Sequence, residues 1–324
     1  MPGITFRNVT KLFDGSSASR AAVNNITLDV HEREFVVLLG PSGCGKTTLM
    51  RMVNRLIEPT SGEISVGDRD IHQISITDLR RQIGYVIQQG GLFPHMTVAQ
   101  NIATVPRLLG WPKDRTAKRV DELLELVALS PDEYRGRYPR QLSGGQQQRI
   151  GIARAMAADP EVMLMDEPFG AIDAITRGDL QNELLKIQRK VGKTVMFVTH
   201  DVEEALRLAD RIAVMRSGEV VQFDTPLNIL SRPADAFVEE LVGTQDVLRA
   251  MSLIPVTQVM QPLDGSANGL AIRDDEDVRA ALSLLIANGA QVLTVQNTDG
   301  RPVGQVTLQA VMLQGRHEAE PVAP

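Results

Sequence analysis

The chain has 324 residues, of which 43% are hydrophobic and 23% charged, as in an ordinary globular protein of roughly two domains. Its 34 Lys and Arg against 40 Asp and Glu leave a net charge of −6, which argues against a duplex nucleic-acid binder. The chain has one cysteine, Cys44, which excludes an intramolecular disulfide and fits a reducing compartment. The sequence shows no secretory signal and no apolar run of the ~18 residues that a membrane helix needs.

The first part of the chain predicts strands followed by a strand–loop–helix unit. Alternating apolar and polar residues predict two strands within residues 4–30, joined by the polar loop DGSSASR. The continuous apolar run EFVVLLG predicts a strand buried on both faces of a parallel sheet. A glycine-rich loop and a helix with apolar positions from Leu49 to Ile57 follow it.

The middle of the chain predicts helices and then further buried strands. Residues 89–158 have mostly helical patterns, and apolar strands follow near Val162 and Thr194. Helical stretches follow each of these strands, and a hairpin turns at Ser217-Gly218. This alternation predicts an α/β fold with a largely parallel sheet.

A second, smaller α/β unit is expected near the C-terminus. Residues 226–251 have helical patterns, and a strand at LAI, a helix, a hairpin at Asp299-Gly300 and a last helix follow. We therefore expect domains at 1–240 and 255–314, a linker at 241–254 and a frayed tail at 315–324.

The loop after the buried strand matches the pattern G-x-x-x-x-G-K-[ST], which is typical of phosphate binding. Its glycines let backbone N–H groups approach phosphate oxygens, and the next helix presents its positive end. Lys46 is expected on the β- and γ-phosphates, the Thr47 hydroxyl on Mg²⁺, and Thr48 near the α-phosphate; Cys44 is expected to be only a small residue there. The predicted nucleotide-binding residues of this loop are Gly40, Pro41, Ser42, Gly43, Cys44, Gly45, Lys46, Thr47 and Thr48.

An acidic pair follows the strand VMLMD, at the edge where ligands bind in open α/β sheets. Asp166 is expected to hold Mg²⁺, and Glu167 to face an attacking water as general base. The alternative is that both acids cap a helix before Pro168.

The run Leu142-Ser-Gly-Gly-Gln146 begins another helix and therefore offers a second anion-binding helix end. A single chain that binds one nucleotide needs only one such helix end. In two copies arranged head to tail, each copy would use its second helix end to bind the nucleotide held by the other copy's glycine-rich loop. We expect a homodimer with nucleotide between the copies, bound also by Ser143, Gly144, Gly145 and Gln146.

In these motifs, residues 2–240 closely resemble the ABC transporter ATPases. The resemblance rests on the phosphate loop, Gln88 after IGYVI, the LSGGQ run, LMDEP, Ala171-Ile-Asp173 and Thr199-His-Asp201. It implies a P-loop NTPase cassette with a RecA-like core, a β-subdomain and a helical subdomain at about 89–158, and ATP and Mg²⁺ as cofactors.

The resemblance also implies further site residues. Gln88 would contact Mg²⁺ or the water and link the site to a membrane partner, Asp173 would bridge the two subunits, and His200 would hold the γ-phosphate and Glu167. Phe13 falls where the family stacks an aromatic ring on adenine, and the alternative is a core position.

Within the family, NRLIEPTSGEI and RYPRQLSGGQQQR are similar to importers of quaternary-amine osmoprotectants such as glycine betaine, carnitine or choline. That likeness implies a transmembrane permease and an extracytoplasmic solute-binding protein as partners, and a peripheral place on the cytoplasmic face of the inner membrane. The alternatives are another cargo, such as an amino acid or sulfonate, or an ABC protein that acts away from membranes on ribosomes or DNA.

The C-terminal unit resembles one CBS module, and the family commonly carries two. This implies an adenine nucleotide as ligand, or sensing of ionic strength at an anionic membrane; two single copies could also pair across the dimer. The acidic run Asp274–Asp277 would be repelled by an anionic surface, and an ordinary helix start explains it more simply.

Overall fold

The computed structural model describes residues 3–13, 21–87, 91–170, 172, 174–243, 247–263 and 269–317. The chain forms two compact units, Met1–Asp224 and Thr225–Pro324. The helices α10 (Pro226–Ser231) and α11 (Ala236–Val242), which fall in the predicted domain 1–240 except for the last two residues of α11, are grouped with the second unit. The functional domain bounds at residues 240 and 255 stay predictions.

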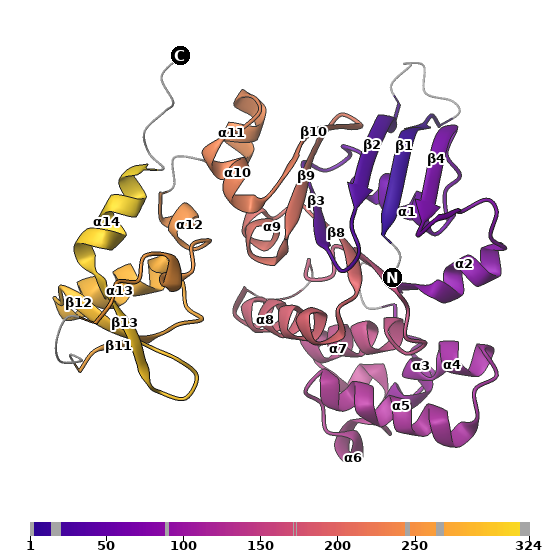
Figure 1. Ribbon diagram of the computed structural model, residues 1–324. Coiled ribbons are helices and arrows are strands. Elements are labelled where there is room, and N and C mark those ends of the chain that lie inside the picture. Colours follow the sequence, from indigo (N-terminus) through magenta and orange to yellow (C-terminus); the bar gives the residue numbers. More distant parts are fainter. Residues whose placement is uncertain are drawn as a thin grey trace. The chain divides into compact units, whose positions relative to one another are not determined.

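A six-stranded sheet forms the centre of the first unit (Figure 1). Its strand order is β10-β9-β3-β8-β7-β6, and every neighbouring pair is parallel except β10 with β9. The carboxyl ends of β3, β7 and β8 therefore lie at one edge, and the largely parallel sheet agrees with the prediction. The strands are β3 (Phe35–Leu39), β6 (Ile83–Val86), β7 (Val162–Asp166), β8 (Thr194–Thr199), β9 (Arg211–Arg216) and β10 (Glu219–Asp224).

An antiparallel sheet of order β2-β1-β4-β5 forms the second layer, and helix α1 (Lys46–Val53) packs between the two sheets. The buried side chains Leu49, Met50 and Val53 of α1 share one core with Phe6 and Leu38 of the flanking strands. Burial on both sides fixes the helix that follows the glycine-rich loop. The strands are β1 (Ile4–Lys11), β2 (Val23–Val30), β4 (Ser61–Val66) and β5 (Arg69–Asp70).

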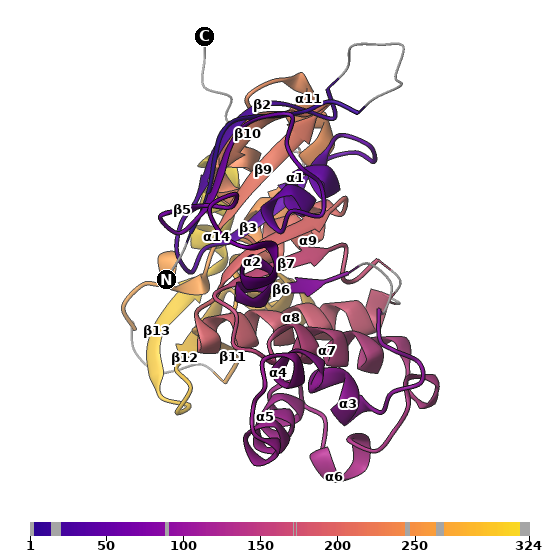
Figure 2. The same ribbon diagram turned by 90° about the vertical axis from the view of Figure 1, so that its right-hand side faces the viewer.

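Helices build the rest of the first unit, and the predicted helical region contains most of them. In both views the helices between β6 and β7 form a layer away from α1 (Figures 1 and 2). The helix α7 packs against α3, α5, α8 and β6. The elements are α2 (Ile76–Gln82), α3 (Val98–Ile102), α4 (Thr104–Leu108), α5 (Lys113–Leu126), α6 (Pro131–Tyr134), η1 (Pro139–Gln141), α7 (Gly144–Ala155), α8 (Ala174–Val191) and α9 (Val202–Leu208).

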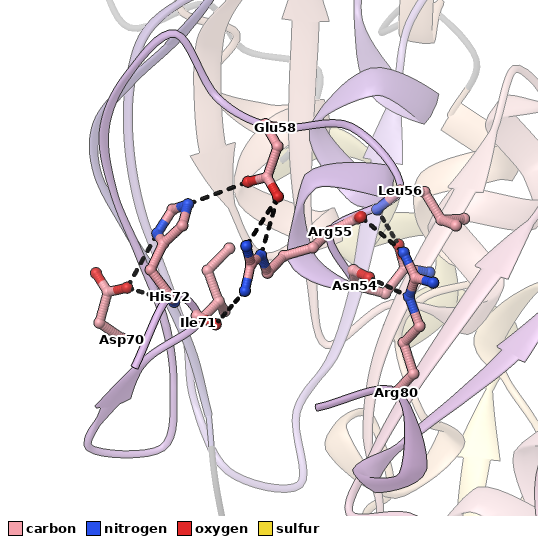
Figure 3. Close-up of polar contacts among 8 residues, drawn as sticks. All are labelled: Asn54, Arg55, Leu56, Glu58, Asp70, Ile71, His72 and Arg80. Atoms are coloured by element: carbon pink, nitrogen blue, oxygen red, sulfur yellow. Dashed lines mark hydrogen bonds and ion pairs between the residues drawn. The ribbon is translucent and has the colours of Figure 1, made fainter. Parts of the chain in front are cut away.

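Helix α1 ends earlier than its apolar pattern predicts, because Arg55 adopts a left-handed backbone with φ of 52°. Figure 3 shows how this end is held: the Arg55 guanidinium contacts Glu58 at 3.0 Å, and Arg80 donates to the carbonyl oxygen of Arg55 at 2.8 Å. His72 lies between Glu58 and Asp70, with each ring nitrogen 3.1 Å from a carboxylate oxygen. Although burial raises it, the hydrogen bonds from Arg55 and His72 leave the pKa of Glu58 below its ordinary value.

The second unit has its own core and a three-stranded sheet of order β11-β12-β13. Its strand, helix, hairpin and final helix follow the predicted order. Asp277 accepts a hydrogen bond from Ala280 N at 2.8 Å and so caps α13, which confirms the helix-start interpretation of the acidic run. The remaining elements are α12 (Val247–Met251), η2 (Val256–Gln258), β11 (Ala271–Arg273), α13 (Val278–Asn288), β12 (Val292–Gln296), β13 (Pro302–Thr307) and α14 (Leu308–His317). Within the described residues of both units, every helix is too short or too polar to cross a bilayer.

Candidate functional site

The glycine-rich loop connects β3 to α1 and takes a shape that two of its glycines make possible. Gly40 and Gly45 have φ of 153° and 107°, and a Cβ on either would collide with a carbonyl oxygen, of Met215 and Ala22 respectively. Gly45 is also the N-cap of α1 and provides no side chain to its first N–H groups. Those N–H groups are available to an external anion.

Lys46 lies beneath the loop, with its side chain almost wholly buried at 5% exposure. Its Nζ donates to the carbonyl oxygens of Gly40 at 2.6 Å and Pro41 at 3.0 Å. These two bonds hold the ammonium against the backbone of the glycine-rich loop. The Cys44 side chain is buried, as expected for a small packing residue, and Pro41, Ser42 and Gly43 are exposed.

The turn between β9 and β10 supports the loop from the side. Gly218 N donates to the carbonyl oxygen of Cys44 at 2.9 Å, and Asn24 N donates to that of Gly218 at 2.8 Å. A cavity of about 340 Å³ lies here, between Ala22, Ser42 and Ser217. The predicted hairpin at residues 217–218 is thus also one wall of the site.

Thr47, Asp166 and Arg51 meet where the loop faces the end of β7. The Thr47 Oγ1 donates to Asp166 Oδ1 at 2.9 Å, and Arg51 Nη2 lies 3.2 Å from Asp166 Oδ2. Asp166 is 2% exposed. The Tyr85 hydroxyl beside Arg51 raises the pKa of that guanidinium, and burial raises the pKa of Tyr85. A charged pair is therefore held in place behind the Thr47 hydroxyl.

These donors fit a magnesium ion that is shared with phosphate. Mg²⁺ prefers oxygen ligands and is commonly held by one or two protein oxygens, with waters and phosphates completing its shell. A hydroxyl and a carboxylate are side by side here, and among the described residues no group of three or more His, Cys, Asp or Glu is arranged so that it could hold a metal ion on its own. The donor set suits a metal that arrives with a nucleotide.

Glu167 and His200 form the second part of the site, at the ends of β7 and β8. The His200 Nδ1 lies 3.3 Å from Glu167 Oε2, and Glu167 N donates to the carbonyl oxygen of Val198 at 3.0 Å. Glu167 has a left-handed backbone with φ of 42°, which is strained for a residue with a side chain. Asp166 ends β7, and the next helix, α8, begins only at Ala174, so the helix-cap alternative for Asp166 and Glu167 is wrong.

The second predicted anion site lies at the start of α7. The Ser143 Oγ accepts from Gln146 N at 3.3 Å, and Gln146 Oε1 accepts from Ser143 N at 3.0 Å, which forms a capping box. Gly145 is buried, whereas a Cβ on Gly144 would have nothing within 4 Å. The helix α1 packs on β4 and β8, so the two helix N-termini belong to different layers of the unit.

The remaining predicted residues divide into two groups. Phe13 is 50% exposed, with Lys11 Nζ 5.2 Å from the ring centroid, so the core alternative for Phe13 is wrong. Thr48 follows Thr47 in α1 and is half-buried. Gln88 and Asp173 lie outside the described residues, and their roles stay predictions.

The sequence motifs did not identify Asn101 and Arg154, which hold the backbone of the segment after Gln88 in place. Asn101 is fully buried; its Nδ2 donates to the carbonyl oxygens of Phe93, Met96 and Thr97, and so it holds the segment that follows Gln88 in the sequence. Arg154 of α7 donates to the carbonyl oxygen of Gly91 at 2.5 Å, and burial lowers the pKa of its guanidinium. Such partners are far away in the sequence and belong to no local pattern.

Comparison with known proteins finds ATP-binding proteins of ABC transporters. The model of the ABC transporter family matches residues 23–170. A carnitine transport ATP-binding protein of Listeria monocytogenes is 47% identical over 313 residues, which cover 97% of this chain and 77% of that protein. A glycine betaine uptake system ATP-binding protein of Escherichia coli is 47% identical over 312 residues, covering 96% of this chain and 99% of that protein.

A solved structure supports the same fold for the first unit. The dimeric post-hydrolysis state of the ATP-binding cassette MJ0796, bound to ADP and phosphate, has a TM-score of 0.61 and 34% identity, and the match covers 69% of this chain and 98% of that one.

Proposed function

Because this chain belongs to the ABC transporter ATP-binding proteins, we propose that it is the ATP-hydrolysing subunit that powers import of a quaternary-amine osmoprotectant through a membrane permease. The observation that carries the proposal is the match of nearly the whole chain to transport proteins for carnitine and glycine betaine. Glycine betaine, carnitine and choline are the expected cargoes. Each presents a permanent cation, which the permease and the solute-binding protein would recognise.

The geometry supports a distinct role for each residue around the nucleotide. Lys46 and the N-terminus of α1 bind the phosphates, and Thr47 and Asp166 hold Mg²⁺, whose charge would offset that of the β- and γ-phosphates. Phe13 stacks on the base. Glu167 accepts a proton from the attacking water, and His200 orients that carboxylate from 3.3 Å.

The helix start at Ser143–Gln146 belongs, in this proposal, to the site of a second copy. Ser143 and Gly144 are exposed, and the open space beside Gly144 leaves room for a phosphate that another subunit binds. The solved ATP-binding cassette with similar fold is described as dimeric. Asp173 would bridge the two copies, and Gln88 would report the nucleotide to the permease.

A groove on the helical layer is suited to contact the permease. The cavity of about 390 Å³ has an apolar floor that includes Ala103 and Val120, with Trp111 on its wall and the cations Arg107 and Lys113 at its rim. Helix α3, which contributes Ala99 to this groove, also carries Asn101, the residue that fixes the segment after Gln88. A short helical segment of the permease with apolar and acidic side chains fits these properties.

The C-terminal unit is proposed to be a single CBS-like regulatory domain over residues 255–314, with an adenine nucleotide as its ligand. Its support is the βαββα arrangement of β11, α13, β12, β13 and α14. The chain as a whole would be peripheral, on the cytoplasmic face of the inner membrane, through the permease.

Uptake measurements test the transport function. A strain that lacks this protein is supplied with the natural chain or with Glu167→Gln, and uptake of labelled glycine betaine, carnitine, choline, proline and spermidine is compared. We expect only the natural chain to restore uptake, and only of the quaternary amines. Restoration confined to proline or spermidine would contradict the cargo, and copurification with ribosomes without a permease would contradict the transport role.

A further inference from the structure

Arg177, near the start of α8, bonds to both of the turns that carry the proposed hydrolytic residues. Its Nη2 donates to the carbonyl oxygen of Ile172 at 2.9 Å, and its Nη1 lies 3.3 Å from Asp201 Oδ2. Ile172 ends the described part of the turn after Glu167, and Asp201 directly follows His200. One planar guanidinium therefore connects two loops that arise from different strands.

Two backbone hydrogen bonds connect Glu167 to Ile172, the residue to which Arg177 donates. Gly170 N donates to the carbonyl oxygen of Glu167 at 3.2 Å, and Ile172 N donates to that of Phe169 at 3.1 Å. Phe169 is fully buried, and its ring centroid lies 5.9 Å from that of Phe197 on β8. A shift of the Ile172 carbonyl would therefore reach the backbone of Glu167 through this turn.

The turn at His200 is also linked to α8 by hydrogen bonds through the buried carboxylate of Glu204. The Thr199 Oγ1 accepts from Asp201 N at 3.0 Å and donates to Glu204 Oε2 at 2.6 Å. Glu204 is 4% exposed, and its Oε1 accepts from Gln181 Nε2 of α8 at 3.3 Å. Both sequence neighbours of His200 thus belong to one network with Arg177 and Gln181.

We propose that Arg177 is a positioning residue that keeps Glu167 and His200 in contact during ATP hydrolysis. The need for such a residue follows from two observations: Glu167 has a strained backbone, and the His200 side chain is 57% exposed. Strained backbone persists only where the surroundings hold it. A displacement of about 1 Å at reacting groups can cost ~100-fold in rate, so a loose pair would slow hydrolysis without weakening nucleotide binding.

The test compares kcat, KM and melting temperature of the full-length chain with Mg²⁺ and ATP. In Arg177→Gln we expect kcat to fall by roughly 10- to 100-fold with KM nearly unchanged. Arg177→Lys should recover part of the loss, because an ammonium can bond to one turn but cannot span both. The matched control is Arg119→Gln: Arg119 likewise donates to carbonyl oxygens, of Met156 at 3.1 Å and Ala157 at 3.4 Å, but lies in α5.

A kcat for Arg177→Gln no lower than that of Arg119→Gln would overturn the proposal. If Arg177→Gln does not fold, Asp201→Asn decides, because asparagine caps α9 as well as aspartate does but removes the carboxylate that lies 3.3 Å from Arg177 Nη1, while Glu204 Oε1 stays 4.0 Å from Arg177 Nε. An unchanged kcat in Asp201→Asn would then overturn it. The proposal rests on the assignment of Glu167, so Glu167→Gln is assayed in parallel: if that variant still hydrolyses ATP, the assignment of the base fails whatever Arg177 does.

Discussion

The Thr47 Oγ1 donates a hydrogen bond of 2.9 Å to Asp166 Oδ1, although 119 positions separate the two residues in the sequence. Thr47 lies in the first turn of α1, the helix that follows β3 and the glycine-rich loop. Asp166 ends the buried strand β7, which lies two places from β3 in the sheet order. Their contact brings a hydroxyl and a carboxylate to the loop that is proposed to bind phosphate. Adjacent oxygen donors of this kind are what a nucleotide-bound magnesium ion requires.

Lys46 should matter more for nucleotide affinity than for folding. In Lys46→Ala the loop loses its buried ammonium, and hydrogen bonds to charged groups are worth about 1.5–3 kcal/mol. We expect the dissociation constant for ATP to rise by roughly 10- to 100-fold in equilibrium binding measurements. An affinity within twofold of the natural chain would contradict the placement of the phosphates.

Gly144 and Gly45 should respond to alanine in opposite ways. Gly144 begins α7 with open space around it, so Gly144→Ala should leave stability unchanged or raise it by up to about 1 kcal/mol, yet slow hydrolysis because the added methyl group meets the partner's nucleotide. Gly45→Ala should lower stability, since its φ is 107° and its Cβ would collide with the Ala22 carbonyl. Thermal melts and ATPase rates separate the two effects. Full ATPase activity in Gly144→Ala would contradict a role in the partner's site.

Glu204 should make stability depend on pH. Burial raises the pKa of Glu204 above its ordinary value of 4.5, so the folded state holds the proton more tightly than the unfolded state. Its contribution to the free energy of unfolding is thus fully present below about pH 4.5 and is lost as pH rises through the folded pKa. Glu204→Gln removes this titration, and we expect its stability relative to the natural chain to increase from acid to neutral pH. The measurement is the free energy of unfolding of both proteins from denaturant titrations at several pH values. A difference between them that stays the same at every pH would contradict the prediction.

Trp111 offers a test of the permease groove, and it is the only tryptophan of the chain. We expect Trp111→Ala to lower uptake and permease-stimulated hydrolysis while it leaves the basal ATPase rate unchanged. Leu108→Ala is the control, because Leu108 is 73% exposed on the neighbouring α4 but does not line the groove. Equal uptake by both variants would indicate that the permease binds elsewhere.

The local motifs were enough to predict the site's main parts, because each combines a strand end with a specific chemical group. The sequence predicts the strands that end before Gly40 and Glu167, the helix after Lys46 and the helix that begins near Ser143, and the structure has all four. Each is predicted from short-range patterns: apolar runs, helical spacing of apolar residues and glycine-rich loops. The fold class follows from their alternation.

The residues that hold these parts together could not be predicted in the same way. Arg51, Arg177 and Asn101 act through partners that the fold brings near, and isolated arginines or asparagines in helices are most often solvent-exposed. The early end of α1 had no signal either, because a left-handed Arg55 is stabilised by its contacts with Glu58 and Arg80 rather than by its own preference.

The dimerisation of Glu167→Gln with ATP tests the central claim most directly. Size-exclusion chromatography with light scattering should show a monomer without nucleotide and a stable dimer with Mg²⁺ and ATP, because binding is retained while the proposed base is removed. Ser143→Arg in the same background is expected to abolish that dimer, since it would place a bulky cation at the helix start shared by the two copies. A Glu167→Gln protein that binds ATP and stays monomeric at saturation would contradict the shared nucleotide site.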